Sequence, residues 1–152
     1  MLNIKLDNSH ISINDNSKSK KSVLEKLSSI LSETTGIDAD EIFNQLYERE
    51  RLGSTSVGNG VALPHARLHG INVPYISVIV LEDAIDFDNI DDFDVDIVLC
   101  LIVPYEQTDN HLVLLSSLSQ ILDDISNRKK IRSSRNTEQI ITCLESENLN
   151  YI

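Results

Sequence analysis

Two continuous apolar runs stand out in the second half of the chain. They span Tyr75 to Leu81 and Val95 to Val103, and both are built from β-branched and aliphatic residues. Runs of this kind are typical of strands that are covered on both faces by helices. Pro104 ends the second run, and a looser alternation around Ile11 to Ile13 predicts one further short strand.

Apolar residues recur at helical spacing in several other segments. The predicted helices carry their apolar stripes over Val23–Leu31, Ile42–Tyr47, Leu112–Leu122 and Thr137–Leu144. The basic stretch Arg128–Arg135 is a further candidate for a short helix. Asp38 and Glu41 have the spacing of a capping box before the second helix, and Gly36 and Gly53 are natural helix ends. Thr108, Asp109 and Asn110 are each possible N-caps of the third helix. Helices on both faces of a small sheet predict an α/β or α+β fold, with too few strands for a barrel.

Length and composition agree with one globular domain. The 152 residues are 41% hydrophobic and 24% charged. A chain of this length and composition can bury a hydrophobic core without disulfide bonds or a structural metal ion. We expect a single domain over residues 1–152, with its core at about 17–144 and residues 1–16 as a lead-in strand. Cys100 and Cys143 both lie in apolar runs, which predicts buried thiols in a reducing compartment.

Charge and hydropathy exclude several classes of partner. Acidic residues number 24 against 13 basic ones, so the formal net charge is −11 and nucleic acid or an anionic membrane is a poor partner. The N-terminus lacks the pattern of a signal peptide, and no apolar stretch approaches the roughly 20 residues of a membrane span. We therefore expect a cytoplasmic protein without membrane insertion.

Two of the four histidines lie beside backbone features that favour anions. His65 follows the segment Gly53 to Gly60, whose small residues could present serial N–H groups to an oxyanion. His111 lies near the start of the third predicted helix, whose positive end also favours an anion. His10, close to the N-terminus, is expected to be exposed, and His69 lies in a polar turn.

Three arginines flank the same segment. Arg49 and Arg51 precede it and Arg67 follows His65. Guanidinium groups at a phosphate site would supply bidentate donors, whereas the alternative is that they are exposed charges at a helix end.

The sequence disfavours a metal site and implies no cofactor. Asp92 to Asp96 match the start of an EF-hand loop, but Ile97 stands where that loop needs Gly and Val103 where it needs Glu. His65 and His69 have a zinc-like spacing of four, but the adjacent proline and glycine disfavour the helix that this spacing requires.

Three blocks of sequence resemble one known family. Arg49 to Arg67, which reads RERLGSTSVGNGVALPHAR, resembles the signature of type-2 enzyme IIA of the bacterial phosphoenolpyruvate-dependent phosphotransferase system, the fructose/mannitol/nitrogen-regulatory family. Leu101 to Leu112 resembles its other active-site segment, and Ser17 to Glu25 resembles the start of its first helix, closest to the nitrogen-regulatory branch. The resemblance runs from about Ser17 to Leu144 and implies the type-2 IIA fold, a small mixed β-sheet flanked by helices on both faces.

The resemblance also implies a reaction and its residues. His65 falls on the phosphorylated histidine, His111 on the second active-site histidine and Arg49 on the arginine near the phosphate. Three further positions fall in the loop that lines the pocket: Ser54, Thr55 and Asn59. The phosphoryl donor would be a histidine phosphocarrier protein of the HPr or NPr type.

A IIA with no fused permease and with the lysine-rich segment from Ser17 to Lys21 resembles the regulatory type, which acts on target proteins. One alternative is a sugar-transport IIA that passes its phosphoryl group to a separate IIB domain. Another is an unphosphorylated IIA-like module that binds proteins. The acidic run from Glu82 to Asp96 has the sign of charge that attracts a basic phosphocarrier.

Overall fold

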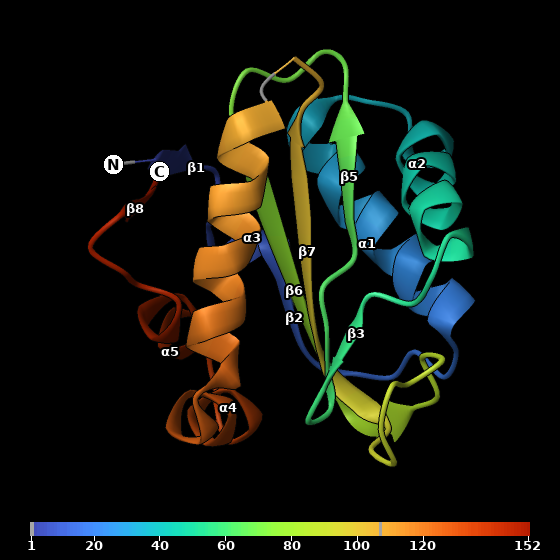
Figure 1. Ribbon diagram of the computed structural model, residues 1–152, viewed down its shortest axis with the longest axis vertical. Coiled ribbons are helices and arrows are strands. Elements are labelled where there is room, and N and C mark those ends of the chain that lie inside the picture. The colour runs from blue at the N-terminus through green and yellow to red at the C-terminus, as the bar shows by residue number, and fades with distance from the viewer. Residues whose placement is uncertain (1, 107) are drawn as a thin grey trace.

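The computed structural model describes residues 2–106 and 108–152, and it places a six-stranded mixed sheet between two layers of helices (Figure 1). The strands are β1 (Leu2–Ile4), β2 (Ile11–Asp15), β3 (Ser56–Gly58), β4 (Val61–Ala62), β5 (His65–Leu68), β6 (Tyr75–Ile85), β7 (Val95–Pro104) and β8 (Leu149–Tyr151). The helices are η1 (Asn8–His10, a 3-10 turn), α1 (Lys20–Thr35), α2 (Ala39–Arg51), α3 (Thr108–Asp123), α4 (Ile125–Arg132) and α5 (Thr137–Cys143).

The antiparallel pair β6 and β7 forms the centre of the sheet. Strand β2 runs parallel to β6 on one side, and β4 and β5 both run parallel to β7 on the other. Strand β3 closes that side as an antiparallel partner of β4. A separate pair of parallel strands, β1 and β8, brings the two ends of the chain together.

Each face of β6 and β7 contributes to its own hydrophobic core. Val78 and Leu99 are buried toward α3, α4 and α5, whereas Ile79 and Cys100 are buried toward α1 and α2. Because successive side chains of a strand point to opposite faces, a strand covered on both sides needs an unbroken apolar run. The predicted strands and the predicted α/β architecture are therefore confirmed (Figure 1).

Helix α1 ends at the predicted Gly36 but begins before the predicted start at Val23. Helix α2 begins just after the predicted cap Asp38, without the reciprocal bond from Glu41 that a capping box needs. Ser19 caps α1 and forms a reciprocal capping box with Ser22, and Gly36 ends it in the left-handed conformation at φ 77°. Asp38 caps α2 through a hydrogen bond from the backbone N–H of Asp40. The two helices pack their apolar stripes on the same face of the sheet.

The helices of the second half are also present, with one shift. Helix α4 begins at Ile125, three residues before the predicted start at Arg128, because Asp124 accepts hydrogen bonds from the N–H groups of Ser126 and Asn127. The prediction for the N-cap of α3 fell on side chains outside the described part of the chain. Within that part, no helix has both the length and the apolar character needed to cross a membrane.

The Gly53 to Gly60 segment forms a β-hairpin rather than an open anion-binding loop. Gly58 and Val61 pair across it, so Asn59 and Gly60 are its two turn residues, with φ values of 57° and 78°. Positive φ at both positions is the requirement of a type I′ turn, for which Asn-Gly is a preferred sequence. Asn59 and Gly60 serve this turn, so the segment forms a hairpin rather than the possible phosphate cradle.

Replacing Gly60 with alanine is expected to destabilise the protein by about 2–3 kcal/mol. A Cβ atom there would lie 2.5 Å from Arg132 and 3.2 Å from the backbone oxygen of Asp94, and it would also strain a positive φ. Gly36→Ala is the matched control, because Gly36 has nearly the same φ and nothing within 4 Å of the added atom. We expect it to cost about 1 kcal/mol. Urea unfolding measures both, and equal losses would contradict the steric argument.

Two side chains are buried differently from the sequence-based expectation. His10 is only 1% exposed, because η1 turns its ring inward, where it bonds the carbonyl of Ile76 and the hydroxyl of Thr34, each at 3.1 Å. Cys143 is only partly buried, whereas Cys100 is fully buried, and neither forms a disulfide.

Candidate active site

His65 is the first residue of β5 and pairs with Leu101 of the parallel strand β7. The strand's burial alternates: Ala66 and Leu68 are buried against the α1 and α2 layer, which leaves His65 and Arg67 on the other side of the strand. Pro64, just before it, accepts a hydrogen bond from the backbone of β7 at 2.9 Å through its carbonyl group. The histidine backbone is thus held by the sheet while its ring faces out.

Hydrogen bonds at both ring nitrogens assign the tautomer of His65. Nδ1 lies 2.9 Å from the carbonyl oxygen of Leu63, and a carbonyl only accepts, so Nδ1 carries the proton. Nε2 lies 3.3 Å from Nε of Arg49, and a guanidinium only donates, so Nε2 carries the lone pair. The structure therefore holds the ring neutral with its nucleophilic nitrogen facing Arg49.

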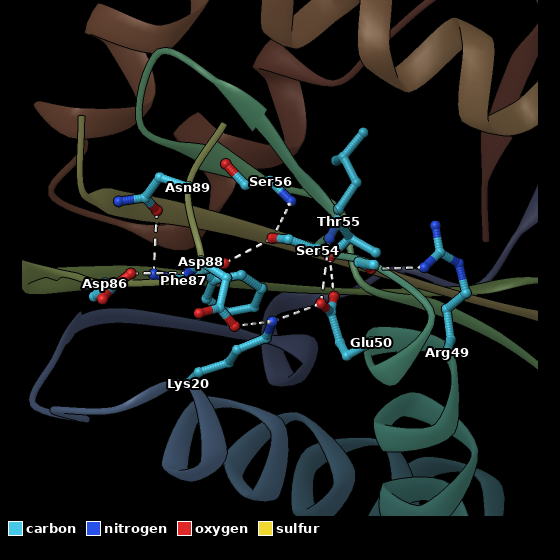
Figure 2. Close-up of polar contacts among 12 residues, drawn as sticks. Lys20, Arg49, Glu50, Ser54, Thr55, Ser56, Asp86, Phe87, Asp88 and Asn89 are labelled. Carbon is cyan, nitrogen blue, oxygen red and sulfur yellow. Dashed lines mark hydrogen bonds and ion pairs between the residues drawn. The ribbon is translucent and has the colours of Figure 1, made fainter. Parts of the chain in front are cut away.

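Arg49 lies in the last turn of α2 and is held from two sides. Its Nη1 donates to the carbonyl oxygen of Gly53 at 2.8 Å, while its Nε donates to His65. Figure 2 shows the Arg49 side chain extending away from the helix. A guanidinium in this place can transfer its donors to oxygens of a group that becomes attached to Nε2.

His111 lies in the first turn of α3 and approaches His65 edge-on, with ring centroids 5.2 Å apart and planes at 69°. Among the described residues, its Nδ1 is buried without a hydrogen-bond partner. Burial lowers the pKa of His111, and the neighbouring His65 and Arg67 lower it further. These surroundings favour a neutral His111 ring beside His65.

These side chains line an open pocket of about 530 Å³. Its walls are Gln45, Glu48, Arg49 and Leu52 from α2 and its end, His65, Ala66 and Arg67 from β5, together with Tyr105 and His111. Arg67 also lies over the ring of Tyr105, 5.8 Å from its centroid. In the described part of the chain, no three His, Cys, Asp or Glu side chains are grouped to hold a metal ion.

Comparison with known proteins assigns the family. Residues 5–147 match the family model described as the phosphoenolpyruvate-dependent sugar phosphotransferase system, EIIA 2. The chain belongs to the type-2 enzyme IIA family. A nitrogen regulatory protein of Pseudomonas aeruginosa is 41% identical to this IIA over 123 residues, which are 80% of each chain.

Solved structures agree with that assignment. The IIA chain matches the nitrogen regulatory protein IIA-Ntr of Neisseria meningitidis with a TM-score of 0.88 and 30% identity, over 91% of this chain and 95% of that one. It matches the mannitol IIA of Escherichia coli with a TM-score of 0.78 and 17% identity, over 93% and 99% of the two chains. The second likeness concerns the fold alone.

The structure brings three of the predicted IIA site residues together and places three others elsewhere. His65, His111 and Arg49 share the pocket, but the pocket walls do not include the remaining three. Ser54 donates to the carbonyl of Phe87, Thr55 is bonded to Glu50, and the N–H of Asn59 is bonded to Asp91: these side chains and the turn tie the hairpin to its neighbours.

Two residues near His65 were not assigned to the site from the resemblance, although Arg67 was noted as a flanking charge. Arg67 could have been found, because residues two apart on a strand share a face and His65 begins β5. Glu50 gave no signal, since acidic residues near a helix end are usually exposed, whereas this one is only 7% exposed.

The His65 ring of this IIA is expected to titrate below pH 6.5. Burial is the largest influence and lowers the pKa of His65. The charge of Arg49 lowers the pKa further, whereas the hydrogen bond to Leu63 and the charge of Glu50 raise it. Between the lowered pKa and about 6.5 the unfolded chain binds more protons than the folded one, so His65 costs stability as the pH falls through this window. Above about pH 6.5, protonation of His65 does not lower the stability of the folded protein. Proton NMR of the imidazole measures the midpoint, which should rise in Arg49→Ala. A wild-type midpoint above 6.5 would contradict the argument.

Proposed function

We propose that this protein is a phosphoryl carrier of the phosphotransferase system, accepting its phosphoryl group on Nε2 of His65 from a histidine phosphocarrier protein of the HPr or NPr type. The supporting observation is the hydrogen bonding of that ring, with Nδ1 donating to Leu63 and Nε2 facing the pocket as a base. A neutral imidazole whose lone pair is already aimed at the pocket has no proton to lose before it attacks.

The transfer step needs no acid or base from solvent. The Nε2 lone pair forms a bond to phosphorus while the donor's N–P bond breaks, and that electron pair returns to the donor imidazole. The proton on Nδ1 stays in place, and the carbonyl of Leu63 stabilises the positive charge that the ring gains.

Charge neutralisation falls to the groups around Nε2. Arg49 is bonded to this nitrogen in the free protein, so its guanidinium lies where the phosphoryl oxygens would arrive. His111 and Arg67 approach from α3 and from β5. Positioned donors and cations of this kind are the main means by which proteins assist phosphoryl transfer.

The proposed output is regulatory: the phosphorylation state of His65 would alter the binding of target proteins. The supporting observation is the 41% identity to a protein named as nitrogen regulatory, compared with 30% to a fructose-specific EIIA component. Transfer to a separate IIB uses the same chemistry and has no residue here in its favour. Since the phosphocarrier donor is cytoplasmic, we propose the same compartment for this protein, acting as one domain.

The test is incubation of the pure protein with phosphoenolpyruvate, enzyme I and the histidine phosphocarrier, read by intact mass. We expect a gain of one phosphoryl group that is labile in acid and stable in base, as an N–P bond is. No gain from a donor that phosphorylates another IIA would refute the carrier function and favour the protein-binding module.

A further inference from the structure

A buried carboxylate lies directly behind the active-site arginine. Glu50 follows Arg49 in the last turn of α2, and its side chain is 3% exposed. A carboxylate at this end of a helix faces the negative end of the helix dipole, and burial makes the charge more costly still. Its presence therefore depends on specific partners.

The partners of Glu50 come from two other segments. Nζ of Lys20, the first residue of α1, lies 2.8 Å from one carboxylate oxygen and 3.1 Å from Asp88. The same ammonium lies 4.8 Å from the ring centroid of Phe87. Burial disfavours the charged form of Lys20, but its bonds to Glu50 and Asp88 outweigh this effect and raise its pKa. Lys20 is itself at the positive end of α1, so each charge is on the unfavourable end of its helix and is stabilised by the other.

The remaining bonds of Glu50 hold the turn after α2. The carboxylate accepts the backbone N–H of Thr55 at 3.2 Å and also accepts the Thr55 hydroxyl. The backbone carbonyl of Glu50 accepts the N–H of Gly53 at 3.1 Å. Figure 2 shows Glu50 between Lys20 on one side and Thr55 on the other. One residue thus fixes the turn at both Gly53 and Thr55.

Each group that is hydrogen-bonded to the His65 ring is also hydrogen-bonded to a residue of this turn. Gly53 accepts from Arg49, whose Nε then reaches Nε2 of His65. Thr55 accepts the N–H of Leu63 at 3.0 Å through its carbonyl, and Leu63 in turn accepts the Nδ1 proton of His65. A shift of the turn would therefore disturb the nucleophile at both ends of its ring.

We propose that Glu50 is a positioning residue for phosphoryl acceptance by His65, a role that rests on the function proposed above: its carboxylate holds Thr55 in the turn to which Arg49 and Leu63, the two groups bonded to the imidazole, are themselves hydrogen-bonded. Lys20 is the counter-charge that allows the carboxylate to remain buried and ionised. Glu50 does not line the active-site pocket, so it acts through Arg49 and Leu63 and not on the phosphoryl group itself.

The kinetic test compares Glu50→Ala and Glu50→Gln with the wild type in single-turnover phosphorylation. We expect Glu50→Ala to lower the rate at saturating phosphocarrier about 10- to 100-fold, since small misplacements of reacting groups have effects of this size. The phosphocarrier concentration for half-maximal rate should not change, because Glu50 lies outside the pocket. Glu50→Gln keeps an oxygen for the Thr55 N–H and should lose less.

The decisive readout is the tautomer of His65 in the unphosphorylated protein, measured by ¹⁵N NMR of the ring. We expect the wild type to carry its proton on Nδ1 and Glu50→Ala to show a mixture of tautomers. Asp83→Asn is the matched control, because it removes a carboxylate from an exposed ion pair of 2.7 Å with Lys18. It should leave rate and tautomer unchanged.

Wild-type rate and tautomer in both Glu50 variants would overturn the positioning role. The tautomer measurement needs no phosphoryl donor, so it decides this role even if the wild type accepts no phosphoryl group and the proposed function fails. Should a Glu50 variant not fold, Thr55→Val removes the hydroxyl bond from the other side, and an unchanged tautomer there would equally overturn the proposal.

Discussion

His65→Ala is expected to abolish phosphoryl uptake completely, because no other described residue of the pocket offers a neutral nitrogen held as a base. His111 is the nearest imidazole, but its ring approaches edge-on and has no partner that fixes its tautomer among the described residues. Intact mass after incubation with phosphoenolpyruvate, enzyme I and the phosphocarrier should show no gain. His69→Ala is the matched control: His69 is exposed, lies outside the pocket walls and should leave the final extent of phosphorylation unchanged.

A phosphorylated His65→Ala protein would identify a different acceptor. His111 would be the first to check, by peptide mapping under basic conditions that preserve the N–P bond. Thermal unfolding of the variant rules out loss of fold as the cause, and little change is expected because the His65 side chain is partly exposed at the edge of a pocket.

Arg49→Ala is expected to slow phosphoryl uptake by about 10²- to 10³-fold while the final extent stays near one group. Among the described residues, the guanidinium is the only donor to Nε2 of His65, and it is oriented by its second bond to Gly53. Rapid-mix quench measurements at saturating phosphocarrier give the rate. Arg49→Lys should recover only part of it, because an ammonium cannot reproduce the two fixed donors.

Arg51→Ala provides the control for loss of a charge from the same helix turn. Arg51 pairs with Glu48 at 3.2 Å, is largely exposed and lies outside the active-site pocket. We expect its rate to stay within about twofold of the wild type, as is usual for an exposed ion pair. Equal slowing of Arg49→Ala and Arg51→Ala would mean that overall charge, and not the contact with His65, controls the reaction.

Predictions from local pattern succeeded where burial is repeated along an element. The runs Tyr75 to Leu81 and Val95 to Val103 are strands because both of their faces are covered, and that condition leaves an unbroken apolar pattern. The strand β5 was not predicted, since its four residues follow a proline and only two are buried. The short strands β1 and β8 pair with each other across almost the whole chain, and neither segment carries that information alone.

The predicted site residues likewise include some that the structure brings together and some that it does not. His65, His111 and Arg49 were assigned from a resemblance to the family, and the structure brings them together. Ser54, Thr55 and Asn59 shared the same block, but the side chains of Ser54 and Thr55 bond to Phe87 and Glu50, and Asn59 is a residue of the hairpin turn. A sequence block shows which residues are neighbours in the chain; on a hairpin, the side on which each one lies depends on pairing and register.

By itself, then, the sequence determined the helices, the two central strands that are covered on both faces and the residue types of a phosphoryl-acceptor site, because hydrophobic period and helix caps are local properties. Tertiary structure alone decided how the imidazole is used. The proton of His65 is held by a carbonyl two residues away, its lone pair by an arginine sixteen residues away, and the turn behind both by an ion pair between Lys20 and Glu50. Contacts at these separations form only when the chain has folded, since their free energy comes from burial and from partners that no local pattern specifies.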